Sequence, residues 1–387
     1  MSVYDDLGIR PTINAWGTVT EIGGSLMDER VLDAMREAAG AFVDVTELLR
    51  VASARIAEDL EVEAALITSG AAAAISVATA ACLTGADPDL ARALPHVGGE
   101  RREVLMLASH RTAYEQQLRL AGAEVVHVDT DGGPVGVEQI LASTRSTTAM
   151  FFFLAEASET DGFSLGELHA ALAPLGIPVV VDAAGELPAP GGAAALLRAG
   201  ADLLILSGGK ELRGPQSSGL LLGSRALIDA CRLNAFPNDS IGRGMKLDKE
   251  TIVGLMTAVR LFAQRDESAL ARSRDAILDD VSAAFAARSD VAVTRFRSTG
   301  PRLRPASILR LAIRPRLIDT ATVRARLLAG TPRVAVGSSD RGIEINPQCL
   351  TEDEVPALVA AISAVLDGAA QTTTPSDDQL RVSTSAS

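Results

Sequence analysis

The stretch LLILSGGKELRGPQSSGLLLG, residues 203–223, joins two apolar runs through a loop that holds a single lysine. The first run, residues 203–206, contains no polar residue, and the second, residues 219–223, is three leucines between two glycines. Unbroken apolar runs of this length are typical of strands buried on both faces of a sheet. The stretch therefore predicts two core strands, with Lys210 just beyond the end of the first.

Further apolar runs of this kind alternate with helical segments between residues 60 and 225. Strands are expected within AALITSG (64–70), EVLMLAS (103–109), AEVVHVD (123–129), TTAMFFFLA (147–155), IPVVVDAAGELP (177–188), ADLLILSGGK (201–210) and SGLLLG (218–223), and helices within 71–83, 110–122 and 164–176. Ser164 and Glu167 form a capping-box pattern at the start of the last helix. The alternation predicts a doubly wound α/β domain with a mostly parallel sheet.

The pattern changes after a long helix expected over residues 246–266. Four short β-rich segments (290–298, 305–313, 331–339 and 341–347) and three helices (268–287, 318–329 and 351–366) predict a smaller domain with an antiparallel sheet. We therefore expect an N-terminal arm over residues 1–25, a large domain over 26–246, a small C-terminal α+β domain over 247–367 and a disordered tail over 368–387.

The composition limits the partners that this protein can have. The 387 residues include 36 basic and 49 acidic side chains, a net charge of −13, which argues against a broad nucleic-acid or anionic-membrane surface. Cys82, Cys231 and Cys349 are isolated, and no cysteine or histidine spacing suits a metal. Because there is no signal peptide or membrane span in the sequence, we expect a cytoplasmic protein with a small-molecule substrate.

Two of the predicted strands end in residues suited to a phosphate and a flat ring. Ligands of α/β sheets gather at the carboxyl ends of the strands. Ser69, Gly70 and Ala71 open a helix whose N-terminal amides would attract an anion, although a plain helix cap is the alternative. His110 follows another strand and could stack on a ring or move a proton, or could only cap the next helix.

Two further strand ends carry a carboxylate and a lysine. Asp182 closes a strongly apolar strand, where a carboxylate is costly unless it meets a cation or a hydrogen-bond donor. Ser207 and Lys210 bracket two glycines, and a lysine at the edge of a core can lose its proton and form a Schiff base. A structural aspartate and a solvated loop lysine are the alternatives.

Taken together, these residues are the parts needed to hold pyridoxal 5′-phosphate (PLP). A phosphate cradle, a carboxylate for the pyridine nitrogen, a stacking ring and a lysine for the aldehyde are all present. Asp182 precedes Lys210 by 28 residues, which leaves room for one helix and one strand between them. This arrangement resembles the fold-type-I, aspartate-aminotransferase-like PLP enzymes.

A narrower resemblance covers residues 3–366. The segments GIRPTINAWGTVTEIGGSLM, AALITSGAAAAI, VVVDAAGELP, SGGKELRGPQSSGLL, IGRGMKLDKE and INP are similar to those of the selenocysteine-synthase-like PLP family, which includes L-seryl-tRNA selenium transferase and D-glucosaminate-6-phosphate ammonia-lyase. The resemblance implies that Lys210 is the Schiff-base lysine, Asp182 the partner of the pyridine nitrogen and Ser207 a phosphate ligand. It further implies that Ser69, Gly70 and Ala71 complete the cradle and that His110 stacks on the ring.

The same resemblance narrows the expected activity. The tRNA-dependent members carry an additional N-terminal domain, whereas this acidic chain starts almost at once with the RPTINAWGT segment, so we expect the small-molecule branch. The leading hypothesis is a lyase that takes the α-proton from a small amino acid and expels a β-substituent. A racemase, an aldolase or a transaminase remains an alternative, as does a catalytically silent interaction protein.

Residues for the substrate are less clearly marked. Arg213, Arg243 and Lys246 could bind a carboxylate or a phosphate, or could form surface ion pairs. Trp16 lies in an arm that is hard to bury on its own domain, and fold-type-I relatives build each site at a subunit interface. We therefore expect a homodimer or a larger assembly of dimers, with the arm and the basic pair reaching the partner's site.

Overall fold

The computed structural model describes residues 2–96, 101–129, 133–155, 162–185, 189–297 and 308–373. They form two compact units. The large unit runs from Gly23 to Arg265, and the small unit joins the residues up to Ile22 with the described chain from Asp266 onward. The expected boundary at residues 246–247 lies before helix α11 (Lys249–Ala263), which packs on α2 (Glu29–Ala39) and α3 (Val45–Asp59) within the large unit.

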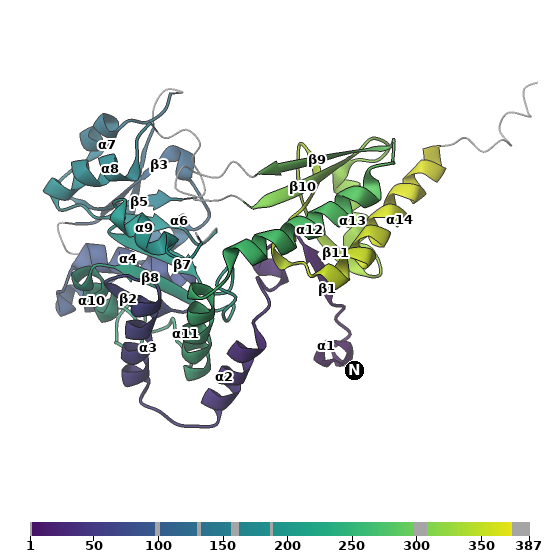
Figure 1. Cartoon of the computed structure of the whole chain (residues 1–387). Coiled ribbons are helices and arrows are strands. Elements are labelled where there is room, and N and C mark those ends of the chain that lie inside the picture. The colour runs from purple at the N-terminus through teal and green to yellow at the C-terminus, as the bar shows by residue number, and fades with distance from the viewer. Residues whose placement is uncertain are drawn as a thin grey trace, which may run out of the picture. The chain divides into compact units, whose positions relative to one another are not determined.

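A seven-stranded sheet forms the centre of the large unit (Figure 1). Its strands are β2 (Ala64–Thr68), β3 (Glu103–Leu107), β4 (Glu124–Val128), β5 (Thr148–Leu154), β6 (Val179–Asp182), β7 (Leu203–Ser207) and β8 (Gly219–Gly223), in the spatial order β2-β8-β7-β6-β5-β3-β4. The pairs from β7 to β4 are all parallel, and only β8 runs against its neighbours β2 and β7. The predicted α/β fold with a mostly parallel sheet is confirmed.

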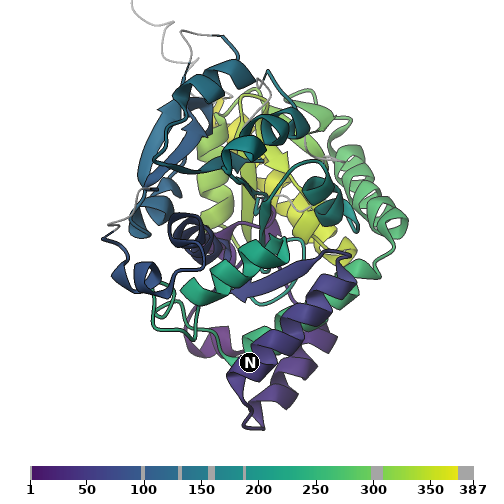
Figure 2. The same ribbon diagram turned by 90° about the vertical axis from the view of Figure 1, so that its left-hand side faces the viewer.

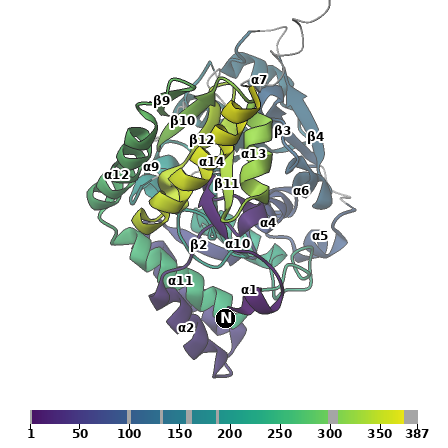
Figure 3. The ribbon, with the colours of Figure 1, turned by 90° about the vertical axis from the view of Figure 1, so that its right-hand side faces the viewer.

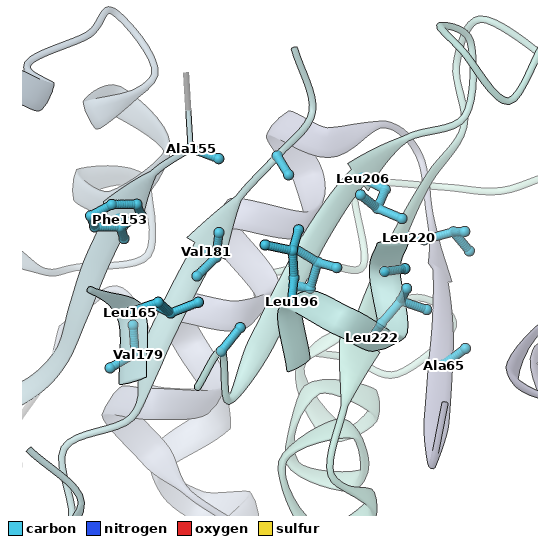
Figure 4. Packing of buried hydrophobic residues seen from close by; sticks show 14 of the residues in the cluster. Ala65, Phe153, Ala155, Leu165, Val179, Val181, Leu196, Leu206, Leu220 and Leu222 are labelled. Atoms are coloured by element: carbon cyan, nitrogen blue, oxygen red, sulfur yellow. The ribbon is translucent and has the colours of Figure 1, made fainter. Parts of the chain in front are cut away.

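Side chains of these strands alternate between two apolar layers. Val179 and Val181 of β6 enter one layer, whereas Val180 enters the other. The first layer is covered by α3, α7 (Val137–Ser143), α8 (Leu165–Leu172), α9 (Gly192–Arg198) and α11, and Figure 4 shows its side chains from β5, β6, β7, β8 and β2 in one row. The second layer is covered by α4 (Ala71–Thr84), α6 (Glu115–Leu120) and α10 (Arg225–Asn234). Burial of both faces explains why the strands carry unbroken apolar runs.

Helix α4 is the innermost helix of the second layer. All of its residues from Ala73 to Thr84 are buried, and it packs on strands β5, β7 and β8 as well as on α5 (Pro88–Ala93), α6 and α10. Its many alanines allow close approach on every side, because a methyl group is the smallest side chain that still favours a helix. The helix is thereby fixed with its N-terminus at the edge where β2 ends. Figure 2 shows the large unit from a second direction, with α2 and α3 in indigo at the bottom.

The small unit is a five-stranded sheet with three long helices (Figure 3). Strands β1 (Thr12–Ala15), β11 (Arg333–Ser339), β12 (Gly342–Ile345), β10 (Leu309–Pro315) and β9 (Val291–Arg297) follow each other in this spatial order, and α12 (Glu267–Phe285), α13 (Thr320–Ala329) and α14 (Val355–Thr373) supply the side chains that fill its core. The four predicted strands and their antiparallel pairing are present. Among the described residues, every helix is too short or too polar to serve as a membrane span.

Two expectations about the chain ends need correction. The arm was expected to resist burial on its own chain, but β1 pairs in parallel with β11 and Ala15 is fully buried in the small unit, after the short helix α1 (Val3–Asp6). The expected tail begins at residue 368, but helix α14 continues to Thr373. Residues 374–387 lie outside the described residues.

Candidate active site

Six of the seven strands of the large sheet point the same way, so their carboxyl ends lie at one edge. All strands except β8 share this direction, because β8 is antiparallel to both of its neighbours and the other pairs are parallel. The segments that follow these ends carry Ser69, Lys210, Asp182 and His110. The fold therefore brings the four segments that were singled out in the sequence to one edge.

Asp182 is the last residue of β6 and lies in the core. Its exposed fraction is 4 %, and its Oδ1 accepts a hydrogen bond of 2.9 Å from the Ala184 amide. Because Val180 of the same strand enters the layer of α4, the alternation of the strand directs Asp182 to that layer as well. A carboxylate in this position is oriented by the backbone and lies on the same side of the sheet as α4.

Ser207 closes β7 on the same face as Asp182. Its neighbour two residues back, Ile205, belongs to the layer of α4, and Ile205 pairs with Asp182 across the sheet. Ser207 itself is opposite Gly219 of β8, which in turn is opposite Thr68 at the end of β2. Ser207 is thus separated from the entrance to α4 by a single strand.

The N-terminus of α4 rests directly on this intervening strand. A Cβ added at Gly219 would come within 2.5 Å of the Gly70 carbonyl carbon and 2.7 Å of the Ala71 nitrogen. Gly70, at the N-cap, has a φ of +102° and provides no side-chain cap. The first turn of α4 contains no acidic residue. Ser69, Gly70 and Ala71 are all half-buried. The first amides of α4 are therefore available to an anion, in a place that the glycine on β8 keeps narrow.

Lys210 is half-buried in a tightly tied loop between β7 and β8. The Gly208 amide donates to the Ser218 carbonyl at 2.8 Å, and the Gly208 carbonyl accepts from the Gly214 amide at 2.8 Å. The Lys210 carbonyl accepts from the Arg213 amide at 2.9 Å, which closes a turn. These bonds explain the run of small residues around the lysine, since the backbone segments approach each other too closely for larger side chains.

His110 follows β3 in the short helix η2 (Ala108–His110) and is fully buried. Its Nδ1 accepts a hydrogen bond of 3.1 Å from the Leu154 amide at the end of β5, which fixes the orientation of the ring. The ring meets Phe153 edge to face with centroids 4.8 Å apart. The structure thus places His110 at the same edge of the sheet as Asp182 and Lys210, but inside the core. Its stacking role stays a prediction.

The helix after His110 is anchored by a buried carboxylate. Glu115 lies 2.8 Å from Arg119 Nη2 and 3.2 Å from His127 Nε2. Burial by itself raises the pKa of Glu115, but the hydrogen bonds from Arg119 and His127 outweigh it, so the pKa is lowered from its usual range. The carboxylate stays charged at neutral pH and ties α6 to β4.

The candidate substrate residues of the large unit, Arg213, Arg243 and Lys246, all have exposed side chains. Arg213 is exposed and adopts a φ of +54°. It lies near Asp28, whose pKa falls to about 2 chiefly through a hydrogen bond from the Arg30 side chain. The charge of Arg213 also contributes to the lowered pKa of that carboxyl. Nε of Arg243 lies 3.7 Å from Oδ1 of Asp239, with which it forms an ion pair. Lys246 is exposed.

Trp16 belongs to the small unit. The guanidinium of Arg324 lies 5.0 Å from the centre of its ring, so Trp16 has a packing contact within this unit.

Two of the three cysteines, Cys82 and Cys231, are buried in the core of the large unit. Burial raises the pKa of Cys82 to about 12 and also raises that of Cys231, so both thiols stay protonated.

Gly219 is a site residue that the sequence reasoning missed. Its only sequence signal is a glycine at the first position of an apolar strand, where a larger residue would have been expected. Its importance depends on the pairing of β8 between β2 and β7, which joins segments about 150 residues apart and is not visible in the local pattern.

The residues at this edge fit PLP by their chemistry. The uncapped N-terminus of α4 and the hydroxyl groups of Ser69 and Ser207 suit a dianionic phosphate. A buried carboxylate, Asp182, on the same face suits a protonated pyridine nitrogen. The primary amine of Lys210 suits the aldehyde.

Replacement of Gly219 by alanine tests the cradle. We expect Gly219→Ala to lower PLP affinity about tenfold or more, because the new methyl group pushes the α4 N-terminus out of place, at an overpacking cost of about 1–3 kcal/mol. Equilibrium dialysis with PLP measures the loss. Gly244→Ala is the matched control, since nothing lies within 4 Å of its added Cβ. If the PLP affinity of Gly219→Ala is unchanged, the α4 N-terminus does not bind the phosphate.

Comparison with known proteins supports the same interpretation. Residues 168–287 match the family model described as SelA: L-seryl-tRNA selenium transferase. A D-glucosaminate-6-phosphate ammonia lyase of Salmonella typhimurium is 26 % identical over 377 residues, which cover 95 % of this chain and 99 % of the relative. A 5′-C-glycyluridine monooxygenase-decarboxylase of a Streptomyces species is 35 % identical over 266 residues, 67 % of this chain, and the match spans 65 % of that relative.

Solved structures agree with these relatives. The structure of a D-glucosaminate-6-phosphate ammonia-lyase matches with a TM-score of 0.80 and 25 % identity over 96 % of this chain and 99 % of the other. A ureidoglycine-glyoxylate aminotransferase from Bacillus subtilis matches with a TM-score of 0.60 at 17 % identity, over 94 % of each chain, which shows the shared fold alone. The predicted fold type, family resemblance and cofactor are confirmed.

Proposed function

We propose that this chain, which belongs to the selenocysteine-synthase-like family of fold-type-I PLP-dependent enzymes, is a lyase that releases ammonia from a small amino acid. The observation that supports it most is the end-to-end likeness to a D-glucosaminate-6-phosphate ammonia-lyase in both sequence and structure. The edge that carries Asp182, Ser207 and Lys210 supplies the groups that such a reaction needs.

Each residue at this edge has a distinct task in the proposal. The amine of Lys210 would hold the cofactor through its aldehyde, and the free amine would accept the α-proton of the substrate. Asp182 keeps a proton on the pyridine nitrogen. Ser69, Gly70, Ala71 and Ser207 bind the phosphate. When bound, PLP supplies an electron sink for the carbanion at the α-carbon.

The overall change balances without an external oxidant. Nζ of Lys210 takes the α-proton, and the β-substituent leaves with the electrons of its bond to the β-carbon. Hydrolysis of the released unsaturated amine then gives a 2-oxo acid and ammonia. A protonated Lys210 can return its proton to the departing group, so one residue serves as base and then as acid.

A second candidate rests on the more identical Streptomyces relative. The name of that protein describes a monooxygenase-decarboxylase of a glycyl nucleoside, which loses a carboxyl group with the use of dioxygen. The α-carbon of an amino acid is the reacting centre in both candidates, so the same lysine and carboxylate would serve. The leaving group and the demand for oxygen separate the two.

Product analysis with PLP-loaded enzyme decides between these activities. The substrates are D- and L-amino acids with a β-hydroxyl group, with and without a distal phosphate, together with glycine derivatives. We expect ammonia and a 2-oxo acid in equal amounts and no uptake of oxygen. Carbon dioxide formed together with oxygen uptake would establish the decarboxylase instead. Exchange of the α-proton without either product would point to a racemase.

We also propose that the protein acts in the cytoplasm as a homodimer. Leu26, Phe42 and Val43 are exposed on the large unit, and a second copy would bury them. Arg243 and Lys246 are exposed cations of the same unit that could then serve the partner's phosphate or substrate. Buried thiols such as Cys82 and Cys231 suit a reducing compartment.

Light scattering and subunit mixing test the shared site. The expected mass is that of a dimer or a multiple of it, and an active monomer would contradict the proposal. Mixing Lys210→Ala chains with Arg243→Ala chains should restore activity above that of either parent, because a hybrid dimer regains one intact site. Proven subunit exchange without recovery would remove Arg243 from the partner's site.

A further inference from the structure

The main chain is held from outside the loop at both neighbours of Lys210, namely Gly209 and Glu211. The Gly209 carbonyl, which precedes the lysine, accepts hydrogen bonds of 3.1 Å from both the amide and the Oγ of Ser25. The Glu211 carbonyl, which follows it, accepts a hydrogen bond of 3.3 Å from Nη1 of Arg265. Ser25 and Arg265 are 184 and 54 residues away from these partners, so both contacts are products of the fold.

Arg265 is itself fixed in three ways. Its Nη1 lies 2.8 Å from Oε1 of Glu211, and the side chains of both residues are largely buried. Its guanidinium lies 4.7 Å from the ring centre of Phe262, one turn earlier on the chain. A buried ion pair with a stacked guanidinium and a shared backbone acceptor has little freedom to rearrange. Arg265 therefore holds the main chain at Glu211 as well as its carboxylate.

We propose that Ser25 and Arg265 are positioning residues that aim Lys210 at the cofactor aldehyde, an inference that rests on the proposed role of Lys210. A lysine side chain has four rotatable bonds, so a mobile backbone would spread its amine over a large volume. Fixing the main chain at Gly209 and Glu211 restricts that freedom and raises the effective concentration of the amine at the aldehyde. Neither residue touches the cofactor in this proposal.

Ser25 and Arg265, the two clamp residues, also lie next to the points where the chain passes between the units. Ser25 comes two residues after the large unit begins at Gly23, and Arg265 is the last residue of its main segment. The chain thus passes from one unit to the other beside each of the residues that hold the lysine loop. This placement explains why a loop lysine would be tied to such distant segments.

Two ligands separate aiming of the lysine from general shaping of the pocket. PLP has an aldehyde that reacts with Lys210, whereas pyridoxine 5′-phosphate has an alcohol there and cannot react. For Ser25→Ala and Arg265→Gln, we expect the dissociation constant of PLP to rise about tenfold, the loss of about one hydrogen bond to a charged or fixed group. The dissociation constant of pyridoxine 5′-phosphate should change less than about twofold.

Arg260→Gln is the matched control for Arg265→Gln. Arg260 lies on α11, which ends two residues before Arg265, and its Nε lies 3.8 Å from Oδ2 of Asp59 in α3, so neither ligand should lose affinity. Arg265→Lys keeps a cation for Glu211 and should recover part of the PLP affinity. Equal weakening of both ligands, or no weakening of either, would overturn the proposal. If Arg265→Gln fails to fold by circular dichroism, Ser25→Ala, which removes one hydroxyl group, decides the question.

The same measurements in a Lys210→Ala background separate the two proposals. If Lys210 bonds the cofactor, its removal alone weakens PLP and leaves pyridoxine 5′-phosphate unchanged, and adding Ser25→Ala or Arg265→Gln then has no further effect. If Lys210→Ala weakens PLP binding but Ser25→Ala and Arg265→Gln do not, only the positioning role of Ser25 and Arg265 is refuted. No effect of Lys210→Ala on either ligand would refute the role of the lysine itself.

Discussion

Lys210→Ala is expected to yield a folded protein that holds PLP only noncovalently and has lost at least about a thousandfold in turnover. The side chain is half-buried and its loop is tied by backbone hydrogen bonds, so the truncation leaves the fold in place. What disappears is the amine that bonds the aldehyde and accepts the α-proton, two tasks with no substitute at this edge. Borohydride reduction followed by peptide mass spectrometry should find the pyridoxyl group on Lys210 of the parent protein and nowhere in the variant.

Two other lysines serve as controls for this experiment. Lys246 is exposed, and Lys249 is paired with Glu250 at the start of α11. Neither Lys246→Ala nor Lys249→Ala should remove the covalent adduct. An adduct found on either of them in the parent protein, with Lys210 unmodified, would show that the lysine has been assigned wrongly.

The sheet of the large unit could be predicted from the sequence because its strands are buried on both faces. Residues 179–182 and 203–207 read as unbroken apolar runs, and each ends at a polar residue that marks the edge of the core. Strand β1 could not be found in this way. It has four residues, of which only Ala15 is fully buried, and it forms through parallel pairing with β11 more than 300 residues later. Long-range pairing of this kind leaves no local pattern.

The candidate site shows the same division between local and long-range information. Asp182 and Lys210 could be singled out because a charged residue directly after an apolar strand is costly without a purpose. The surroundings of His110 could not, since they depend on the Leu154 amide at the end of a neighbouring strand. Ser25 and Arg265 carry no sequence signal at all, because a serine and an arginine in polar segments are ordinary.

Asp182→Asn is expected to keep PLP binding and fold while turnover falls by about two to three orders of magnitude. An asparagine has nearly the same shape, and its side-chain oxygen can still accept from the Ala184 amide. It cannot supply the negative charge that keeps a proton on the pyridine nitrogen, so the α-proton becomes harder for Lys210 to remove. The loss should appear in kcat across neutral pH, with little change in the dissociation constant of PLP.

A permanent positive charge on the ring separates the electrostatic role of Asp182 from a structural one. Loading the variant with PLP that is methylated at the pyridine nitrogen should recover part of the turnover, because that nitrogen is cationic without a partner. Asp202→Asn is the matched control: this carboxylate lies at the opposite edge of the same sheet, where it accepts from the Val179 amide at 2.8 Å and contacts His169. Asp202→Asn should lower the stability of the fold, and its turnover should not increase with the methylated cofactor. Wild-type turnover of Asp182→Asn at neutral pH would reduce Asp182 to a structural residue.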